Sequence, residues 1–318
     1  MNPPVLLTCR IPSALLARLN EACDVERLEG PAAPFVLADR VRGKHALICL
    51  LTDEVGRAVI DAGQALRIIA NIAVGYNNID VAHARSRGIV VTNTPDVLTE
   101  ATAEFTWGLI LAAARRIAEG ERLLRRGAWK GWALDFLLGM ELRGKQLGVV
   151  GMGRIGRAVA AKAPAFGMRV AFAEQGGGDA ASPVEHAIRL SLDELLVRSD
   201  VVTLHVPLTP ATRHLIDRRA LARMKRTAIL VNTSRGPVVD EDALIWALEE
   251  RLIAGAALDV YEREPEFHPK LLEFENVVLA PHIASATRET RTAMAELAVR
   301  NVLNVLSGQP PLTPVTLD

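Results

Sequence analysis

The sequence of 318 residues has no excess of charge of either sign, because 37 Lys and Arg residues balance 37 Asp and Glu residues. Without a basic surface, the chain has no feature that favours nucleic acid as a partner. Without an acidic tail, it has none that favours a disordered segment. We therefore expect its ligand to be a small molecule.

Cysteines are few, and long apolar runs are absent. Cys9, Cys23 and Cys49 show neither close pairing nor the spacing of metal ligands, and no basic and then apolar leader opens the chain. The most apolar helical stretch, residues 107–114, is too short to span a bilayer. These absences predict a cytoplasmic protein with no metal site and no membrane contact.

The sequence does contain a glycine-rich turn between two apolar runs. The run at residues 147–150 is followed by Gly151, Gly153 and Gly156, then by a helical stretch, and the second run ends at Glu174. Glycine is needed where such a chain turns sharply, where a pyrophosphate lies against the backbone, and where helix and strand pack closely. The pattern predicts a dinucleotide site with its phosphates at the helix N-terminus.

The acid at the end of the second run decides which dinucleotide we expect. A carboxylate at the tip of this strand can accept both ribose hydroxyls of the adenosine half, but it would repel a 2′-phosphate. Glu174 therefore favours NAD over NADP. Gln175 and the glycines at 176–178 form a loose loop that can turn the acid away, so NADP is disfavoured rather than excluded.

Apolar and amphipathic runs alternate along the whole chain, which is typical of parallel sheets covered by helices. Before the glycine-rich turn, these runs are residues 5–8, 13–22, 46–51, 65–70 and 89–92. After the turn, we expect strands at 201–205, 228–232, 255–258 and 277–279, and helices at 193–198, 221–224 and 240–250. With the two runs around the turn, this second part has six strands, the pattern of a doubly wound sheet.

Two domains follow from this pattern, since a chain of this length can bury two cores. A long helix begins after Pro95 and runs towards Arg116, leaving the first sheet and entering the second. The amphipathic stretch 289–306 is expected to pack back on the first domain. We predict an α/β fold of two Rossmann-like domains with a cleft between them: a flavodoxin-like substrate-binding domain of residues 1–95 plus 287–318, and a dinucleotide-binding domain of residues 96–286.

Polar residues follow the strands of the second domain, where ligands of doubly wound sheets bind. They are His205 with Pro207, Thr233, Ser234, Arg235, Asp259, Glu264 and His282. Hydride transfer to a ketone develops negative charge on its oxygen, so it needs a proton donor and a cation. His282 is our candidate donor. Arg235 is the candidate cation, and its planar fork can also grip a carboxylate.

A carboxylate bonded to the second ring nitrogen would stabilise the protonated histidine. We choose Glu264, although spacing alone does not separate it from Glu262 and Glu266. Taken singly, each candidate also has an ordinary interpretation, because a histidine after a strand, such as His205 or His282, is usually structural.

Two further segments have open interpretations. The loop after the run at residues 68–72 contains Val74 and Gly75; it reads first as a turn, and alternatively as N–H groups that hold an anion. The arm at residues 120–144 contains Trp129, Trp132 and Phe136 among polar residues. Such aromatics indicate a subunit contact or packing on their own domain with equal weight.

These motifs together resemble the D-isomer-specific 2-hydroxyacid dehydrogenases. The resemblance is carried by residues 230–240, 257–265 and 280–283, and it extends through residues 74–80 and 99–104 to essentially the whole chain. It implies that Arg235, Glu264 and His282 form a catalytic triad, and it thereby selects Glu264 over its neighbours. It also implies that Val74 and Gly75 contact the substrate carboxylate.

The resemblance also implies further contacts and an assembly. Residues that it implies hold the cofactor are Thr102, Arg154, Ile155, Thr233 and Asp259, with Asp259 on the nicotinamide carboxamide. We add His205 and Pro207, from the end of the strand at 201–205, to the expected cofactor contacts. Segments 129–132 and 136–139 look most like the glyoxylate and hydroxypyruvate reductases, which are dimers joined through the cofactor domain. One departure concerns the cofactor: members that use NADPH carry a small polar and then a basic residue where this chain has Glu174 and Gln175.

Our leading hypothesis is a homodimeric NAD-dependent oxidoreductase that interconverts a small 2-oxo acid, glyoxylate or hydroxypyruvate, and its D-2-hydroxy acid. Leu51 and Phe136 are the expected walls of a pocket for a small apolar group. One competitor is an NADH-sensing protein of the corepressor type, against which the intact triad argues. Another is phosphite oxidation on the same fold.

Overall fold

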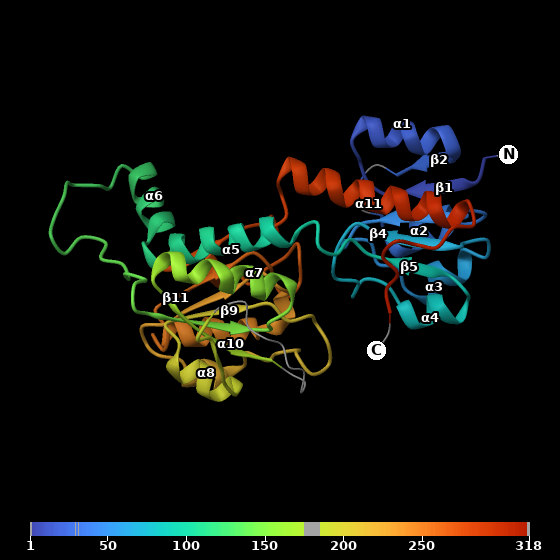
Figure 1. Cartoon of the computed structure of the whole chain (residues 1–318). Helices are drawn as coiled ribbons and strands as arrows, with labels where there is room; N and C mark the ends of the chain where they lie inside the picture. The colour runs from blue at the N-terminus through green and yellow to red at the C-terminus, as the bar shows by residue number, and fades with distance from the viewer. Residues whose placement is uncertain (1, 29, 31, 175–184, 317–318) are drawn as a thin grey trace. The chain divides into compact units, whose positions relative to one another are not determined.

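The computed structural model describes residues 2–28, 30, 32–174 and 185–316 (Figure 1). The chain divides into two compact units, Met1–Leu98 with Ala286–Asp318 and Thr99–Ser285. Each unit is built on one sheet, of five strands in the first and seven in the second, and all paired strands are parallel. The predicted α/β class with two parallel sheets is confirmed.

The sheet of the first unit has the strand order β2-β1-β3-β4-β5. Its strands are β1 (Pro4–Leu7), β2 (Asp24–Arg27), β3 (Ala46–Cys49), β4 (Ile68–Asn71) and β5 (Val90–Thr92). Strands β3 and β4 are fully buried, as expected where helices cover both faces of a parallel sheet. The helices are α1 (Ser13–Ala22) and α11 (Arg288–Leu306), which pack together, and α2 (Pro34–Arg40), α3 (Arg57–Ala62) and α4 (Val81–Ser86) (Figure 1).

Sequence patterns missed β2 and the three shorter helices of this unit. β2 is an edge strand of sequence Asp-Val-Glu-Arg with no fully buried residue, so it has no apolar run to signal it. Helices α2, α3 and α4 have only six or seven residues, too few for helical periodicity to stand out. The expected strand at 65–70 begins later, because Leu66 packs in a turn before β4.

Helix α11 reaches the first unit from the far end of the sequence. Arg67 donates hydrogen bonds to the carbonyls of Val305 (2.7 Å) and Leu306 (3.2 Å), which are among the carbonyls a helix C-terminus leaves without partners. A cation at this end also interacts favourably with the helix dipole.

The sheet of the second unit has the order β12-β11-β10-β9-β6-β7-β8. Its strands are β6 (Gln146–Val150), β7 (Arg169–Ala173), β8 (Ile188–Arg189), β9 (Val201–Leu204), β10 (Ile229–Asn232), β11 (Gly255–Leu258) and β12 (Val277–Leu279). We expected six strands, and the seventh is β8. It is an exposed edge pairing of two residues, which leaves no apolar pattern in the sequence.

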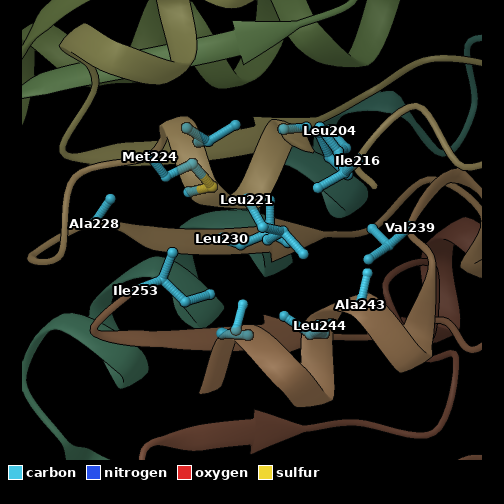
Figure 2. Close-up of a cluster of buried hydrophobic side chains, with 14 of the residues drawn as sticks. Leu204, Ile216, Leu221, Met224, Ala228, Leu230, Val239, Ala243, Leu244 and Ile253 are labelled. Atoms are coloured by element: carbon cyan, nitrogen blue, oxygen red, sulfur yellow. The ribbon is translucent and has the colours of Figure 1, made fainter. Parts of the chain in front are cut away.

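Helices cover both faces of this second sheet (Figure 1). α5 (Thr99–Ala114) and α7 (Arg154–Lys162) pack together on one face, while α8 (Leu192–Arg198), α9 (Arg218–Arg223) and α10 (Glu241–Glu249) cover the other. Figure 2 shows the core beneath α9 and α10, where Leu204 and Leu230 from the sheet meet Leu221 and Leu244 from the helices. This core fixes the sheet edge on which the polar residues lie.

One part of the second unit extends away from its sheet. Helix α6 (Ile117–Arg125), which contains the first residues of the arm at 120–144, buries no side chain. The rest of the arm forms a long loop between α6 and β6 (Figure 1). Within the part of the chain that the structure describes, no helix has both the length and the apolar character needed to cross a membrane.

Candidate active site

Three predicted site residues follow three neighbouring strands of the second unit. Arg235 lies in the loop after β10, Asp259 directly follows β11, and His282 lies just after β12. These strands are adjacent and parallel, so their carboxyl ends share one edge of the sheet. The topology thus places the candidate cation and the candidate proton donor on the same edge.

The histidine is paired with one of the three acids that spacing left open. His282 Nδ1 lies 2.7 Å from Glu264 Oε2, and the N–H of Tyr261 donates to Glu264 Oε1 at 3.0 Å. Glu262 instead contacts the ring of His214 at 2.8 Å. Burial opposes ionisation of Glu264, but the hydrogen bond and charge of His282, with Tyr261 N–H and Arg235, lower the pKa of Glu264 from 4.5. Because Glu264 stays ionised and contacts Nδ1, the other ring nitrogen, Nε2, is the one that can exchange a proton with a substrate.

Asp259 holds the turn that carries His282. Its side chain is fully buried, and its carboxylate accepts the N–H groups of Ile283 (2.7 Å) and Ala284 (2.8 Å). Its main-chain carbonyl accepts the N–H of His282 at 2.8 Å. Burial raises the pKa of Asp259, and the two hydrogen bonds oppose this shift. The predicted contact of Asp259 with the nicotinamide carboxamide stays a prediction.

Asn232 shapes the loop that carries Arg235. Its Nδ2 donates to the carbonyl of Arg235 at 3.0 Å, and its Oδ1 accepts from the N–H and the hydroxyl of Ser234 at 3.0 and 2.8 Å. Burial lowers the pKa of Arg235, and the charge of Glu264 opposes that change. Since a guanidinium titrates far above neutral pH, Arg235 remains a cation whose field reaches Glu264.

A second anchor holds the loop around Glu264. The buried carboxylate of Glu241, at the start of α10, accepts the N–H groups of Glu262 (2.6 Å) and His268 (3.2 Å) on either side of Glu264. Sequence reasoning missed both Asn232 and Glu241. Their partners are mostly main-chain groups, which no side-chain pattern displays, and an acid in the first turn of a helix is ordinary.

The glycine-rich turn has the geometry expected of a phosphate-binding loop. Gly151 has φ +95°, and a Cβ there would lie 2.7 Å from the carbonyl oxygen of His205. A Cβ at Gly156 would lie 2.0 Å from the carbonyl oxygen of Gly151. The space beside Gly153 is open. Close packing at the first and third glycines and open space at the second fit a pyrophosphate held against the backbone before α7.

Glu174 follows β7, as the sequence predicted for the residue on the adenosine ribose. Its Oε2 is buried, and among the described residues it has no hydrogen-bond partner. Two ribose hydroxyls would supply the donors that this oxygen lacks. Gln175 and the glycines at 176–178 lie outside the described residues. The residues at this edge therefore fit a dinucleotide.

Other predicted cofactor residues lie along the same unit. Thr102 in α5 is buried, and Thr106 bridges its carbonyl (2.7 Å) to the hydroxyl of Thr233 (2.9 Å). Arg154 and Ile155 begin α7. The ring of His205 contacts the hydroxyl of Thr203 (2.9 Å), and burial of the ring lowers its pKa to about 3, so this ring stays neutral. Pro207 offers its carbonyl to the hydroxyl of Thr212 at 2.6 Å.

The predicted substrate residues Leu51, Val74 and Gly75 belong to the first unit, in the loops after β3 and β4. The carbonyl of Val74 accepts from Asn93 Nδ2 (2.8 Å), and that of Gly75 accepts from Asn71 Nδ2 (2.9 Å). Phe136, the other predicted pocket wall, lies on the arm of the second unit and is 39% exposed. Among the described residues, no group of three or more His, Cys, Asp and Glu side chains could hold a metal ion.

Comparisons with known proteins agree on one family. Residues 107–284 match the model of the D-isomer specific 2-hydroxyacid dehydrogenase NAD binding domain. The glyoxylate reductase of Thermofilum pendens is 49% identical over 317 residues, which cover 98% of this chain and 93% of that protein.

Two crystal structures are similar over nearly the whole chain. A protein from Thermus thermophilus has a TM-score of 0.92 and 47% identity, with 98% of this chain and 100% of that chain covered. The NADPH-dependent glyoxylate/hydroxypyruvate reductase of Sinorhizobium meliloti, in complex with NADP and malonate, has a TM-score of 0.89 and 36% identity, with 99% and 97% covered. The chain belongs to the D-isomer-specific 2-hydroxyacid dehydrogenases, and within them to the glyoxylate reductase subgroup, as an NAD(P)-dependent oxidoreductase.

Proposed function

We propose that this enzyme uses NADH to reduce glyoxylate to glycolate, or hydroxypyruvate to the D-2-hydroxy acid. The observation that carries the proposal is the contact of 2.7 Å between His282 and Glu264, on the sheet edge that also carries Arg235. A proton donor, its carboxylate and a cation are the groups that carbonyl reduction requires. Relatives that bear the name glyoxylate reductase support the choice of substrate.

Each residue then has a separate task. Nε2 of His282 gives a proton to the carbonyl oxygen, and Glu264 stabilises the charged ring before that transfer. Arg235 balances the charge that develops on the oxygen and binds the substrate carboxylate. The N–H groups of Val74 and Gly75 are the proposed anion-binding groups of the first unit. NADH, when bound, supplies the hydride. Thr102, Gly151, Arg154, Ile155, Thr233 and Asp259 are the proposed cofactor contacts, with Gly153, Gly156 and Glu174.

A substrate panel tests this proposal directly. Initial rates would be measured with glyoxylate, hydroxypyruvate, pyruvate and phenylpyruvate, each with NADH or NADPH, and with phosphite and NAD or NADP. We expect glyoxylate or hydroxypyruvate with NADH to give the highest kcat/KM. A chain that binds NADH but turns over none of the 2-oxo acids, or that oxidises phosphite fastest, would overturn the proposal.

The preference for NADH is proposed from Glu174, whose Oε2 has no hydrogen-bond partner among the described residues. This carboxylate suits ribose hydroxyls and repels a 2′-phosphate. Glu174→Gln should raise kcat/KM with NADPH relative to NADH by roughly tenfold, because a repulsion of about 1.4 kcal/mol corresponds to that factor. Glu250→Gln, which removes an exposed acid of the same unit, should leave the ratio unchanged. A wild-type enzyme that already prefers NADPH would show that the ribose assignment is wrong.

We further propose that the enzyme is a homodimer joined through the cofactor domain and the arm at residues 120–144. Trp132 is 81% exposed and Leu134 is 82% exposed. The neighbouring helix α6 also has no buried side chain. Clustered exposed aromatic and aliphatic side chains are typical of subunit contacts.

The three cysteines are free and buried, which supports our prediction of a reducing, cytoplasmic setting.

Replacing Trp132 and Leu134 together by serine should raise the dimer dissociation constant by roughly a hundredfold or more, since interface energy concentrates in a few large side chains. Sedimentation velocity over a range of concentrations would measure this change. Phe35→Ser removes another large exposed side chain, 77% exposed and in α2 of the first unit, and should leave the dimer intact. A monomeric wild type, or a double variant that stays dimeric, would contradict the proposal.

A further inference from the structure

In the loop that follows β4, three successive carbonyl groups accept hydrogen bonds. The carbonyl of Ala73 accepts the N–H of Thr94 at 2.8 Å. The carbonyls of Val74 and Gly75 accept from the side chains of Asn93 (2.8 Å) and Asn71 (2.9 Å). Three successive peptide groups are therefore fixed by partners on β5 and β4 or directly after them.

Fixing a carbonyl also fixes the N–H of the next residue. In a planar trans peptide the two groups point in opposite directions, and the only cis bond among the described residues is Glu264–Pro265. The bond from Asn93 to the Val74 carbonyl therefore turns the N–H of Gly75 away from Asn93. In the same way, the bond from the Thr94 N–H to the Ala73 carbonyl turns the N–H of Val74 away from Thr94. In the described part of the chain, neither N–H donates to a main-chain carbonyl, so both are available to a ligand.

The same loop is joined to the turn after β3. Asn78 Nδ2 donates to the carbonyls of Leu50 and Asp53, each at 3.0 Å. The buried carboxylate of Asp53 accepts the N–H of Leu50 (2.7 Å) and the hydroxyl of Thr8 (2.5 Å). The turn that carries Leu51 is thus held together with the loop that carries Val74 and Gly75.

The C-terminal tail holds Asn93 in place. The hydroxyl of Thr313 donates to the carbonyl of Asn93 at 2.6 Å, and the N–H of Asn93 donates to the carbonyl of Thr313 at 3.3 Å. Asn301, a fully buried residue of α11, donates to the Thr313 hydroxyl (2.9 Å) and accepts the N–H groups of Leu312 (2.8 Å) and Thr313 (3.2 Å). A buried asparagine with its amide groups satisfied in this way fixes the tail strongly.

We propose that Asn93 and Thr313 are positioning residues for substrate binding. Thr313 fixes Asn93, and Asn93 orients the peptide between Val74 and Gly75 so that its N–H binds the substrate carboxylate. This inference rests on the proposed function, because it takes the 2-oxo acid as the ligand of Val74 and Gly75. It assigns a task to a tail residue that has no predicted contact with substrate or cofactor.

Steady-state kinetics of Asn93→Ala and Thr313→Val would test the proposal. For glyoxylate we expect KM to rise on the order of tenfold in Asn93→Ala and about threefold in Thr313→Val, because the lost hydrogen bonds leave the peptide free to rotate. The kcat value and the dissociation constant of NADH should stay within about twofold of wild type. Glycolaldehyde, which has no carboxylate, should show an unchanged KM in both variants.

Asn304→Ala is the matched control. Asn304 also lies on α11 and donates to the tail, at the carbonyl of Pro310 (3.2 Å), but has no bond to Asn93. Its KM for glyoxylate should equal that of wild type. Unchanged KM values in Asn93→Ala and Thr313→Val, or equal increases for glyoxylate and glycolaldehyde, would overturn the proposal. If Asn93→Ala fails to fold, Thr313→Val decides, because it keeps Asn93. Wild-type turnover of glyoxylate tests the proposed function separately from these comparisons.

Discussion

Replacing His282 with alanine should lower kcat for the preferred 2-oxo acid by roughly a hundredfold to ten-thousandfold, the usual contribution of a positioned general acid. Without the ring, the proposed proton donor is lost as negative charge develops on the carbonyl oxygen. The dissociation constant of NADH should remain nearly unchanged, because the proposed dinucleotide contacts do not include the side chain of His282. Stopped-flow rates and fluorescence titration with NADH would measure the two quantities.

His83→Ala is a suitable control for this experiment. His83 also contacts a carboxylate, that of Asp61 at 2.9 Å, but it lies in α4 of the first unit. Its replacement should leave kcat unchanged. A His282→Ala enzyme with wild-type turnover would exclude His282 as the proton donor, whatever its contact with Glu264.

Glu264→Gln should change the pH profile of the reduction rate, because it removes the carboxylate that contacts His282. The pKa of Glu264 is lowered from 4.5, so its carboxylate stays ionised as the pH falls through that value and continues to stabilise a charged His282 ring. The neutral amide cannot do so. The rate of reduction by Glu264→Gln should therefore decline with rising pH at a lower pH than the rate of wild type. Identical profiles would indicate that Glu264 only packs against the ring.

The sequence predicted the central strands and the long helices because buried elements show a clear pattern of apolar residues. β3, β4, β9 and β10 are buried along their whole length and mostly apolar, and each lies inside a sheet. The edge strands β2 and β8 carry no such pattern, since only one side of each is paired and their side chains reach solvent.

The same contrast explains what could be predicted of the candidate site. Arg235 and His282 were chosen because the ends of neighbouring parallel strands share an edge, which is a rule of topology. The groups that hold them were not predicted. Asn232 and Glu241 act mainly on main-chain N–H and carbonyl groups, and such contacts depend on how loops fold rather than on spacing. The catalytic and binding roles themselves remain predictions that the kinetic experiments decide.

Replacing Arg235 should lower activity by an amount similar to that of His282→Ala, but for a different reason. Arg235→Gln removes the cation and should lower kcat/KM for glyoxylate by about a hundredfold to a thousandfold, as does loss of one donor to a developing oxyanion. Arg235→Lys keeps a positive charge but loses the planar fork that binds a carboxylate through two parallel bonds. We therefore expect Arg235→Lys to recover part of kcat while KM stays well above that of wild type.

The comparison of the two variants separates the tasks proposed for this residue. Charge balance on the oxygen should survive in Arg235→Lys, whereas orientation of the carboxylate should not. Arg263→Gln removes an exposed arginine of the loop next to Glu264 and controls for a general loss of positive charge. If Arg235→Lys matched wild type in both kcat and KM, Arg235 would act as a point charge alone.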